Sequence, residues 1–279
     1  PKQDASTLPF TWPHMTGQEL SYIAECHFTG RLAGDVPFTK RCHQWLEQRT
    51  GCAKALLTHS CTAALEMAAL LADIQPGDEV ITFAPYFPEY QPYVNGTGAH
   101  LTVVPADTEN FQINFDAFEK ALNPGTAAVL INTPNNPSGA VYSAETLTRL
   151  AEVLNAKQTE YGHDIFLIAD EPYREIAFGG AATPYPAKFY DDTLTCYSFS
   201  KSLSVPGERI GYVAANPRCE DAAYIVPMCG QISRGTGHNC PSSLIQMAVE
   251  RCLDVTSDLS VYETNMNLIY DELIALGFT

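Results

Sequence analysis

The stretch TLTCYSFSKSLSVPGERIGYVAA, residues 193–215, contains two apolar runs joined by a polar loop. The runs 193–200 and 209–215 are predicted to be strands. Strands that are apolar throughout are typical of mostly parallel sheets covered by helices on both faces. The loop between them places Lys201 among small hydroxyl residues, and Arg209 follows a Pro-Gly turn. These two cations are either ordinary surface charges or the holders of an anionic, reactive group.

Outward from this stretch, apolar runs alternate with amphipathic segments from about residue 37 onward. Further strands are predicted at 54–59, 79–83, 101–104, 127–132 and 164–170. Helices are predicted at 37–51, 62–74, near 115–122, 144–160, 239–253 and about 259–276. The pattern predicts an α/β fold with a mostly parallel sheet flanked by helices.

The net charge and the cysteine content exclude several classes of binding partner. The formal net charge is −16, which argues against nucleic acid and anionic membranes, because both require a basic face. The nine cysteines show no CxxC or Cys/His spacing, so we expect neither a disulfide framework nor a metal site. The N-terminal residues show no secretory signal, and no apolar run approaches the length of a membrane span. A cytoplasmic protein is expected.

Four polar motifs each follow a predicted strand. They are SCTAAL (60–65), NTPNNPSG (132–139), DEPY (170–173) and SFSK (198–201). Ligands of open α/β sheets bind at the carboxyl ends of the strands. Any one motif is a weak signal, but together they predict a single site at this edge of the sheet.

One group of these residues suits a phosphate. Ser60, Cys61 and Thr62 begin a helix, where unpaired backbone N–H groups attract anions. Ser198 adds a hydroxyl, and Arg209 can bind a phosphate through two parallel hydrogen bonds. For Ser60 an ordinary helix N-cap is an equally simple interpretation.

Lys201 is the candidate nucleophile. A lysine amine attacks carbonyl groups to form imines once desolvation or a neighbouring cation has lowered its pKa. The alternative is a solvated loop lysine, the commonest environment of this residue.

The remaining candidates suit an aromatic ring. Asp170 ends an apolar strand, and its carboxylate would pair with a protonated pyridine nitrogen. Asn136 and Tyr173 can hydrogen-bond a ring oxygen, and Phe87 can stack on a flat face. Turn or cap roles for Asp170 and Asn136, and core packing for Tyr173 and Phe87, are the alternatives. Taken with Lys201 and the phosphate group, these residues describe pyridoxal 5′-phosphate (PLP).

From about Phe83 to Thr279 the chain resembles class I/II aminotransferases of the aspartate-aminotransferase fold, fold type I. The resemblance rests on PNNPSG, DEPY and SFSKSLSVPGERIGY in this order. It implies that Lys201 forms the Schiff base with PLP, that Asp170 pairs with the pyridine nitrogen, and that Ser198 and Arg209 hold the phosphate. It also implies that Asn136 and Tyr173 bind the ring oxygen. Lys201, Asp170 and Tyr173 are the expected catalytic residues.

The N-terminal part has a different resemblance. Residues 30–81, with SCTAAL, are similar to the nucleotide-sugar aminotransferases of the DegT family, which share the fold. We therefore expect a mosaic joined near residues 76–82; a single uniform family is the competing explanation.

Three regions are expected: an arm and helix at 1–36, a PLP-binding large domain at 37–256, and the start of an interdomain helix at 257–279. The resemblance implies a small C-terminal domain, which is largely absent from this sequence, and a homodimer. The expected activity is amino transfer between an amino acid and a 2-oxo acid through Lys201. Alternatives are a PLP-binding fragment or scaffold with little turnover, a keto-sugar aminotransferase, and a PLP lyase.

Overall fold

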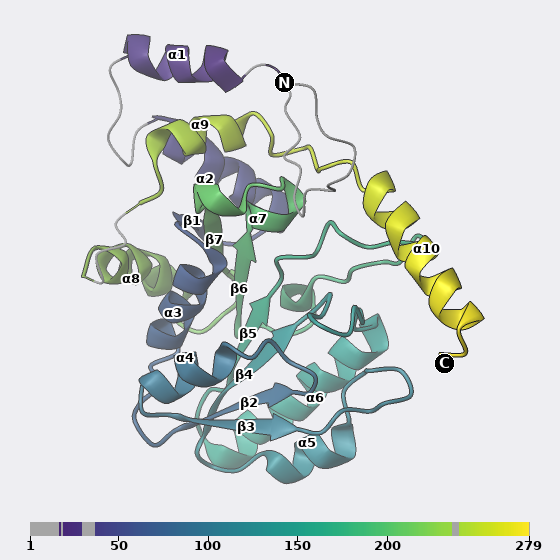
Figure 1. Ribbon diagram of the computed structural model, residues 1–279. Helices are drawn as coiled ribbons and strands as arrows, with labels where there is room; N and C mark the ends of the chain where they lie inside the picture. The colour runs from purple at the N-terminus through teal and green to yellow at the C-terminus, as the bar shows by residue number, and fades with distance from the viewer. Residues whose placement is uncertain (1–16, 18, 30–36, 236–239, 279) are drawn as a thin grey trace.

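The computed structural model describes residues 17, 19–29, 37–235 and 240–278. Its centre is a seven-stranded sheet with the strand order β1-β7-β6-β5-β4-β2-β3. The five strands from β6 to β3 are parallel, whereas β7 runs antiparallel to both β6 and β1. The sheet crosses the middle of the molecule in Figure 1, with helices on both faces. The predicted α/β fold is confirmed.

The elements follow the predicted order closely. The strands are β1 (Lys54–Thr58), β2 (Glu79–Phe83), β3 (His100–Val104), β4 (Thr126–Asn132), β5 (Phe166–Asp170), β6 (Thr193–Ser198) and β7 (Gly211–Ala215). The helices are α1 (Glu19–Thr29), α2 (Pro37–Thr50), α3 (Cys61–Leu71), α4 (Tyr90–Gly96), α5 (Phe115–Ala121), α6 (Ala144–Tyr161), α7 (Phe199–Ser202), α8 (Ala222–Gly235), α9 (Ser243–Glu250) and α10 (Ser260–Ala275). Two short 3₁₀ turns lie at Pro186–Lys188 and Pro206–Glu208.

Sequence patterns missed α4 and α8, because proline and glycine mark breaks in a helical pattern. Pro92 lies inside α4, and Pro227 lies inside α8. The strand predicted at 193–200 also ends earlier than expected. The Ser198 hydroxyl accepts a hydrogen bond from the Ser200 N–H and so begins the single turn of α7.

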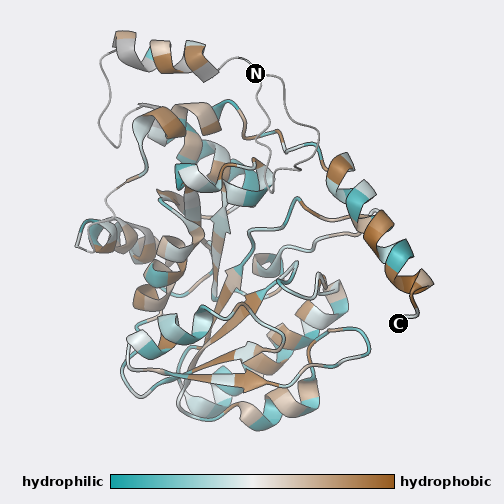
Figure 2. Cartoon of the chain, viewed as in Figure 1, coloured by the Kyte–Doolittle hydropathy of each residue, from teal (hydrophilic) through white to brown (hydrophobic). Residues whose placement is uncertain are grey.

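Alternate side chains of the strands enter different cores, as the two-residue period of a strand requires. On one face, strands β2, β4 and β5 pack against α5 and α6. On the other face, strands β2 and β4 to β7 pack against α3, α4 and α8. A third cluster joins β1, β6 and β7 to α2. Figure 2 shows the apolar strands between these layers.

The last helix, α10, has no buried residue. It lies along one edge of the molecule, away from the sheet, in Figure 1. Its apolar side chains are visible in Figure 2. The domain boundaries proposed from sequence stay a prediction. Among the described residues, no helix is both long enough and apolar enough to cross a bilayer.

The backbone at Gly211 leaves no room for a side chain between β7, β6 and the start of α3. A Cβ atom added there would lie 2.3 Å from the carbonyl oxygen of Tyr197 and 3.0 Å from the carbonyl carbon of Ser60. Only glycine therefore lets β7 lie against β6 and the Ser60 turn at the same time. This contact fixes the turn that begins α3.

Replacing Gly211 with alanine is expected to lower the free energy of unfolding by roughly 1–3 kcal/mol, because backbone atoms must move to admit the methyl group. Urea unfolding followed by circular dichroism measures this change. Gly96→Ala is the control, since a Cβ there meets no atom within 4 Å. Equal midpoints for the two variants would contradict the prediction.

Candidate active site

One pocket, with a cavity volume of about 280 Å³, lies at the carboxyl ends of the central strands. All ten candidate residues from the sequence line it: Ser60, Cys61, Thr62, Phe87, Asn136, Asp170, Tyr173, Ser198, Lys201 and Arg209. Strands β1, β4, β5 and β6 deliver most of them, because each is followed directly by one of the four motifs. The structure therefore brings the predicted set together in one pocket.

Asp170 lies at the centre of the buried side of this pocket, with 6% of its surface exposed. Its carboxylate accepts hydrogen bonds from the Cys61 thiol at 2.8 Å and from the Tyr90 hydroxyl at 2.5 Å. Burial raises the pKa of Asp170, and these two hydrogen bonds oppose that rise. The Asn132 amide also donates to the backbone carbonyl of Asp170 at 2.9 Å, which fixes the end of β5.

The surroundings of Asp170 test whether a pyridine ring suits the site. A buried carboxylate is stable when a cation or several hydrogen bonds compensate its lost hydration. Within the described part of the chain, no Lys, Arg or His forms an ion pair with Asp170. Both of its side-chain partners are neutral donors. The donor set thus fits a protonated ring nitrogen, which would supply the missing positive charge.

The phosphate group of residues lies at the start of α3 and beyond β6. The Ser60 hydroxyl oxygen accepts a hydrogen bond from the Ala63 N–H at 3.1 Å, which confirms the N-cap interpretation. This cap uses a lone pair only, so the hydroxyl hydrogen is still available to an anion. The buried Ser198 hydroxyl lies 2.7 Å from the Ser200 hydroxyl. Hydroxyl groups and the helix terminus thus face one end of the pocket.

Arg209 reaches the same end from a strained backbone position. Its φ of 53° lies in the left-handed region, and one guanidinium nitrogen donates to the Pro206 carbonyl at 2.9 Å. No acidic side chain in the described residues forms an ion pair with it. The remaining guanidinium N–H groups can therefore serve an anion in the pocket.

Lys201, on α7, is exposed, and its Nζ lies 5.7 Å from the centre of the Tyr173 ring. Lys201 therefore keeps contact with solvent at its side of the pocket. Lys201 is nonetheless one of the pocket-lining residues and makes no ion pair within the described chain. Its amine is thus unhindered by an acidic partner.

Asn136, Tyr173 and Phe87 line the rest of the wall. Burial raises the pKa of Tyr173, and a side-chain hydrogen bond with Asn136 opposes that rise. The Asn136 N–H donates to the Asn132 side chain at 2.7 Å, which holds the turn after β4. Phe87 packs edge-to-face on Tyr90 with ring centres 5.7 Å apart. Phe87 therefore combines the packing role with a position in the pocket.

Tyr90 is a site residue that sequence reasoning missed. It is almost fully buried, and its hydroxyl makes the shortest hydrogen bond to Asp170. The available signal was its place in APYFPEY, three residues after Phe87. Helix α4 begins at Tyr90, and this missed helix turns the ring toward β5.

The comparisons agree with this geometry. The family model described as "Aminotransferase class I and II" matches residues 11–271. The chain belongs to the class I and II aminotransferases. Members of this family typically use PLP.

Among curated proteins, an aspartate aminotransferase of Geobacillus stearothermophilus is 33% identical over 74% of this chain and 52% of its own length. A probable N-acetyl-LL-diaminopimelate aminotransferase of Bacillus subtilis is 29% identical over 80% of this chain and 54% of its own. The chain thus spans about half the length of these curated relatives.

Among solved structures, an amino transferase from Eubacterium rectale is 39% identical, with a TM-score of 0.86 over 96% of this chain and 70% of its own. An aspartate aminotransferase from Thermotoga maritima, at 24% identity and a TM-score of 0.80 over 97% of this chain and 72% of its own, shares the fold.

The family match runs without interruption through residues 76–82, where the sequence suggested a change of family. The comparisons show one family over the chain and do not show a part similar to DegT enzymes. The mosaic interpretation therefore stays a prediction.

Proposed function

We propose that this chain is the cofactor-binding part of a PLP-dependent aminotransferase that transfers an amino group between an amino acid and a 2-oxo acid. The observation that carries the proposal is the buried Asp170, which has neutral partners only and lies in the same pocket as Lys201. Family membership and the chemistry of the donor set support it.

Each pocket residue has a role in this proposal. PLP, when bound, supplies an aldehyde for the amine and an electron-withdrawing ring. Lys201 would hold the aldehyde carbon through Nζ, with release of one water molecule. Once the substrate amine had displaced it, Nζ would carry a proton between the substrate Cα and the cofactor C4′ atom. Asp170 keeps the ring nitrogen protonated, with Tyr90 and Cys61 orienting its carboxylate.

The other residues bind and orient. Ser60, Thr62, Ser198 and Arg209 hold the phosphate at the start of α3. Asn136 and Tyr173 hydrogen-bond the ring oxygen, and Phe87 covers one face of the ring. We further propose that the active form is a homodimer, because fold type I sites are expected to lie at subunit interfaces.

The direct test supplies the purified chain with PLP and a panel of amino acids, and measures both cofactor absorbance and formation of 2-oxo acid. Release of a 2-oxo acid equimolar with loss of the cofactor's aldehyde absorbance is expected. Cofactor binding without this exchange would favour a scaffold. Exchange with amino sugars alone would favour a keto-sugar aminotransferase, and elimination products would favour a lyase.

Replacing Tyr90 with phenylalanine is expected to move the acidic limb of activity to higher pH. Asp170 must be ionised, and the Tyr90 hydrogen bond is one of two contacts that lower its pKa. Loss of a hydrogen bond worth about 1.4 kcal/mol corresponds to roughly one pH unit. The measurement is kcat/KM against pH, with Tyr86→Phe as control, since the Tyr86 hydroxyl contacts Gln91 instead. An unchanged profile would remove Tyr90 from the proposed site.

A further inference from the structure

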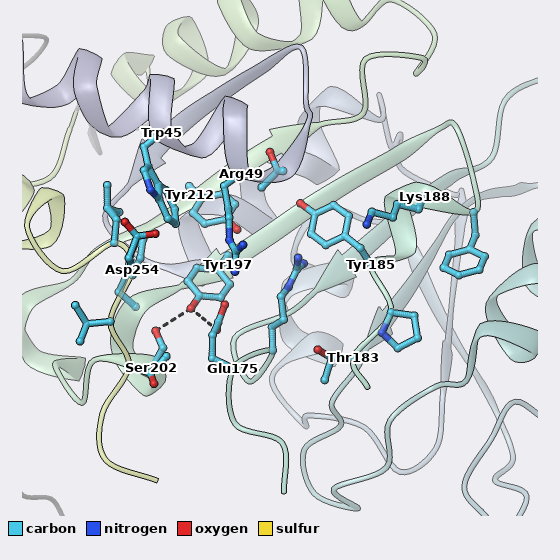
Figure 3. Close-up of a pocket in the computed structure, with 18 residues that line it drawn as sticks. Trp45, Arg49, Glu175, Thr183, Tyr185, Lys188, Tyr197, Ser202, Tyr212 and Asp254 are labelled. Carbon is cyan, nitrogen blue, oxygen red and sulfur yellow. Dashed lines mark hydrogen bonds between the residues drawn. The ribbon is translucent and has the colours of Figure 1, made fainter. Parts of the chain in front are cut away.

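A second cavity, of about 620 Å³, has a set of lining residues of its own (Figure 3). It is bounded by the end of α2, the sheet face of β6 and β7, the segment after β5, and residues 253–256. Nothing in the proposed reaction uses it. Its volume is sufficient for a small organic molecule.

The chain segments around Tyr173 and Lys201 line both cavities, each with different residues. Tyr173 and Lys201 line the cofactor pocket, whereas Arg174 and Ser202, the next residue in each case, line the second cavity. The second cavity is thus a distinct space whose wall is the back of the cofactor site.

Three cations line the second cavity in a chain that has only 16 basic residues in total. Arg49 enters from α2 above Tyr197, and Lys188 enters from the opposite wall (Figure 3). Both are exposed, and neither forms an ion pair with the described residues. Unpaired cations that converge on a concavity are unusual in so acidic a protein and favour an anionic ligand.

The third cation, Arg174, is held rigidly. Glu171, which is 1% exposed, forms an ion pair with its guanidinium, and the Tyr185 ring lies 3.7 Å beneath it. A guanidinium fixed from two sides binds an anion with little loss of side-chain entropy.

The acids that line the cavity form no ion pair with Arg49 or Lys188 within the described residues. Of the two acidic side chains that line it, Glu175 already accepts a hydrogen bond from the Tyr197 hydroxyl at 2.6 Å. The other acid is Asp254. Burial raises the pKa of Tyr197 and Tyr212 well above the ordinary value, so both rings stay neutral near pH 7. Glu171 balances Arg174, so the formal charges of Arg49 and Lys188 are matched in number by those of Glu175 and Asp254, to which the described residues show no ion pair.

The remaining wall is aromatic. Tyr197 and Tyr212 stack with ring centres 4.9 Å apart, and Trp45 lies above them in Figure 3. Flat rings among cations are suited to a ligand that is itself both flat and anionic.

We propose that this cavity is a second ligand site, which binds an aromatic carboxylate between Arg49, Lys188 and the Trp45 and tyrosine rings. The carboxylate pairs with the two exposed cations, and the ring of the ligand packs on the aromatic wall.

Trp45 supplies the measurement. The chain has two tryptophans, so Trp12→Phe leaves Trp45 as the only indole. The probe is 3-phenylpropanoate, which has neither an amino nor a keto group and so cannot undergo amino transfer. It is titrated into the PLP-loaded protein, and Trp45 fluorescence and isothermal titration calorimetry are recorded. A saturable fluorescence change with 1:1 stoichiometry is expected.

Two charge variants and one control locate the binding. Arg49→Gln and Lys188→Gln are each expected to weaken binding about tenfold or more, since a charge-assisted hydrogen bond is lost. Arg218→Gln changes an exposed arginine that is paired with Asp191 and is expected to have no effect. Because the three arginine and lysine side chains are exposed, the variants are expected to fold, which circular dichroism confirms.

Two further measurements test which chemical group of the ligand is recognised and in which cavity the ligand binds. The neutral 3-phenylpropanamide is expected to bind at least tenfold more weakly than the acid, and inorganic phosphate is expected to leave Trp45 fluorescence unchanged. Absence of a Trp45 response at millimolar acid would overturn the proposal. The proposal would also be overturned if the acid and the amide bound with equal affinity. It would be overturned as well if Lys201→Ala weakened binding of the acid while Arg49→Gln did not.

Discussion

Replacing Lys201 with alanine is expected to abolish amino transfer while PLP stays bound without a covalent link. Lys201 is the only lysine that lines the cofactor pocket within the described residues, so no other amine is placed to attack the aldehyde. The phosphate contacts proposed for Ser60, Thr62 and Arg209 are untouched by the change. Turnover is expected to fall below detection, since both the covalent link and the proton carrier are removed.

Borohydride reduction followed by peptide mass spectrometry measures the covalent link. In the unmodified protein, the peptide that contains Lys201 is expected to carry the reduced cofactor. In the Lys201→Ala variant, no peptide is expected to carry it. Lys120→Ala, a change on α5 far from the pocket, is the control and keeps the adduct. A reducible adduct that survives in Lys201→Ala would mean that another lysine is the nucleophile.

Asp170→Asn is expected to retain PLP but to lower kcat at least a hundredfold. The amide oxygen can still accept one of the hydrogen bonds from Cys61 and Tyr90, and the amide NH2 can donate to the sulfur or oxygen of the other, so the side chain keeps two polar contacts. It carries no charge, however, and the protonated ring nitrogen loses its partner. Breaking a buried ion pair costs on the order of 3–5 kcal/mol, and a comparable loss in the transition state gives a hundredfold or more in rate.

Stopped-flow absorbance with a single amino acid isolates the proton-transfer step of Asp170→Asn from product release. Asp164→Asn, at the exposed start of the same predicted strand, is the matched control and should leave the rate unchanged. Full activity in Asp170→Asn would reduce Asp170 to a structural cap and remove the charge argument for a pyridine ring.

Sequence patterns predicted the strands and the pocket better than the short helices. Apolar runs such as 166–170 can be buried only within a sheet covered on both faces, so their position in the fold is nearly determined by composition. The motifs that follow these runs lie at one edge for the same reason. Helix α8 escaped prediction because tertiary packing of residues such as Cys229 outweighs the cost of Pro227 inside the helix. Helix α4 escaped because it has only seven residues, and Pro92, which the first turn of a helix tolerates, marks a break in the sequence pattern.

The contacts that set the chemistry were less accessible to prediction. Tyr90 and Cys61 reach Asp170 from positions 80 and 109 residues away, and side-chain pairs at such separation leave no local pattern. The exposure of Lys201 could be stated from sequence only as an alternative to desolvation, because the exposure of a side chain depends on how neighbouring segments fill space.

The antiparallel pairing of β1 with β7 has a consequence for the order of assembly. Among the strands of the described sheet, β1 comes first in the sequence, and it pairs there with β7, which comes last. The hydrogen-bonding edge of β1 therefore stays unpaired until β7 has been synthesised. The chain between the two strands forms a long loop, and long loops close slowly. The Ser60 turn follows β1 directly and touches Gly211 of β7, so the phosphate-binding end of the pocket is completed in that final step. The affinity of the chain for its cofactor therefore reports whether β1 has paired with β7.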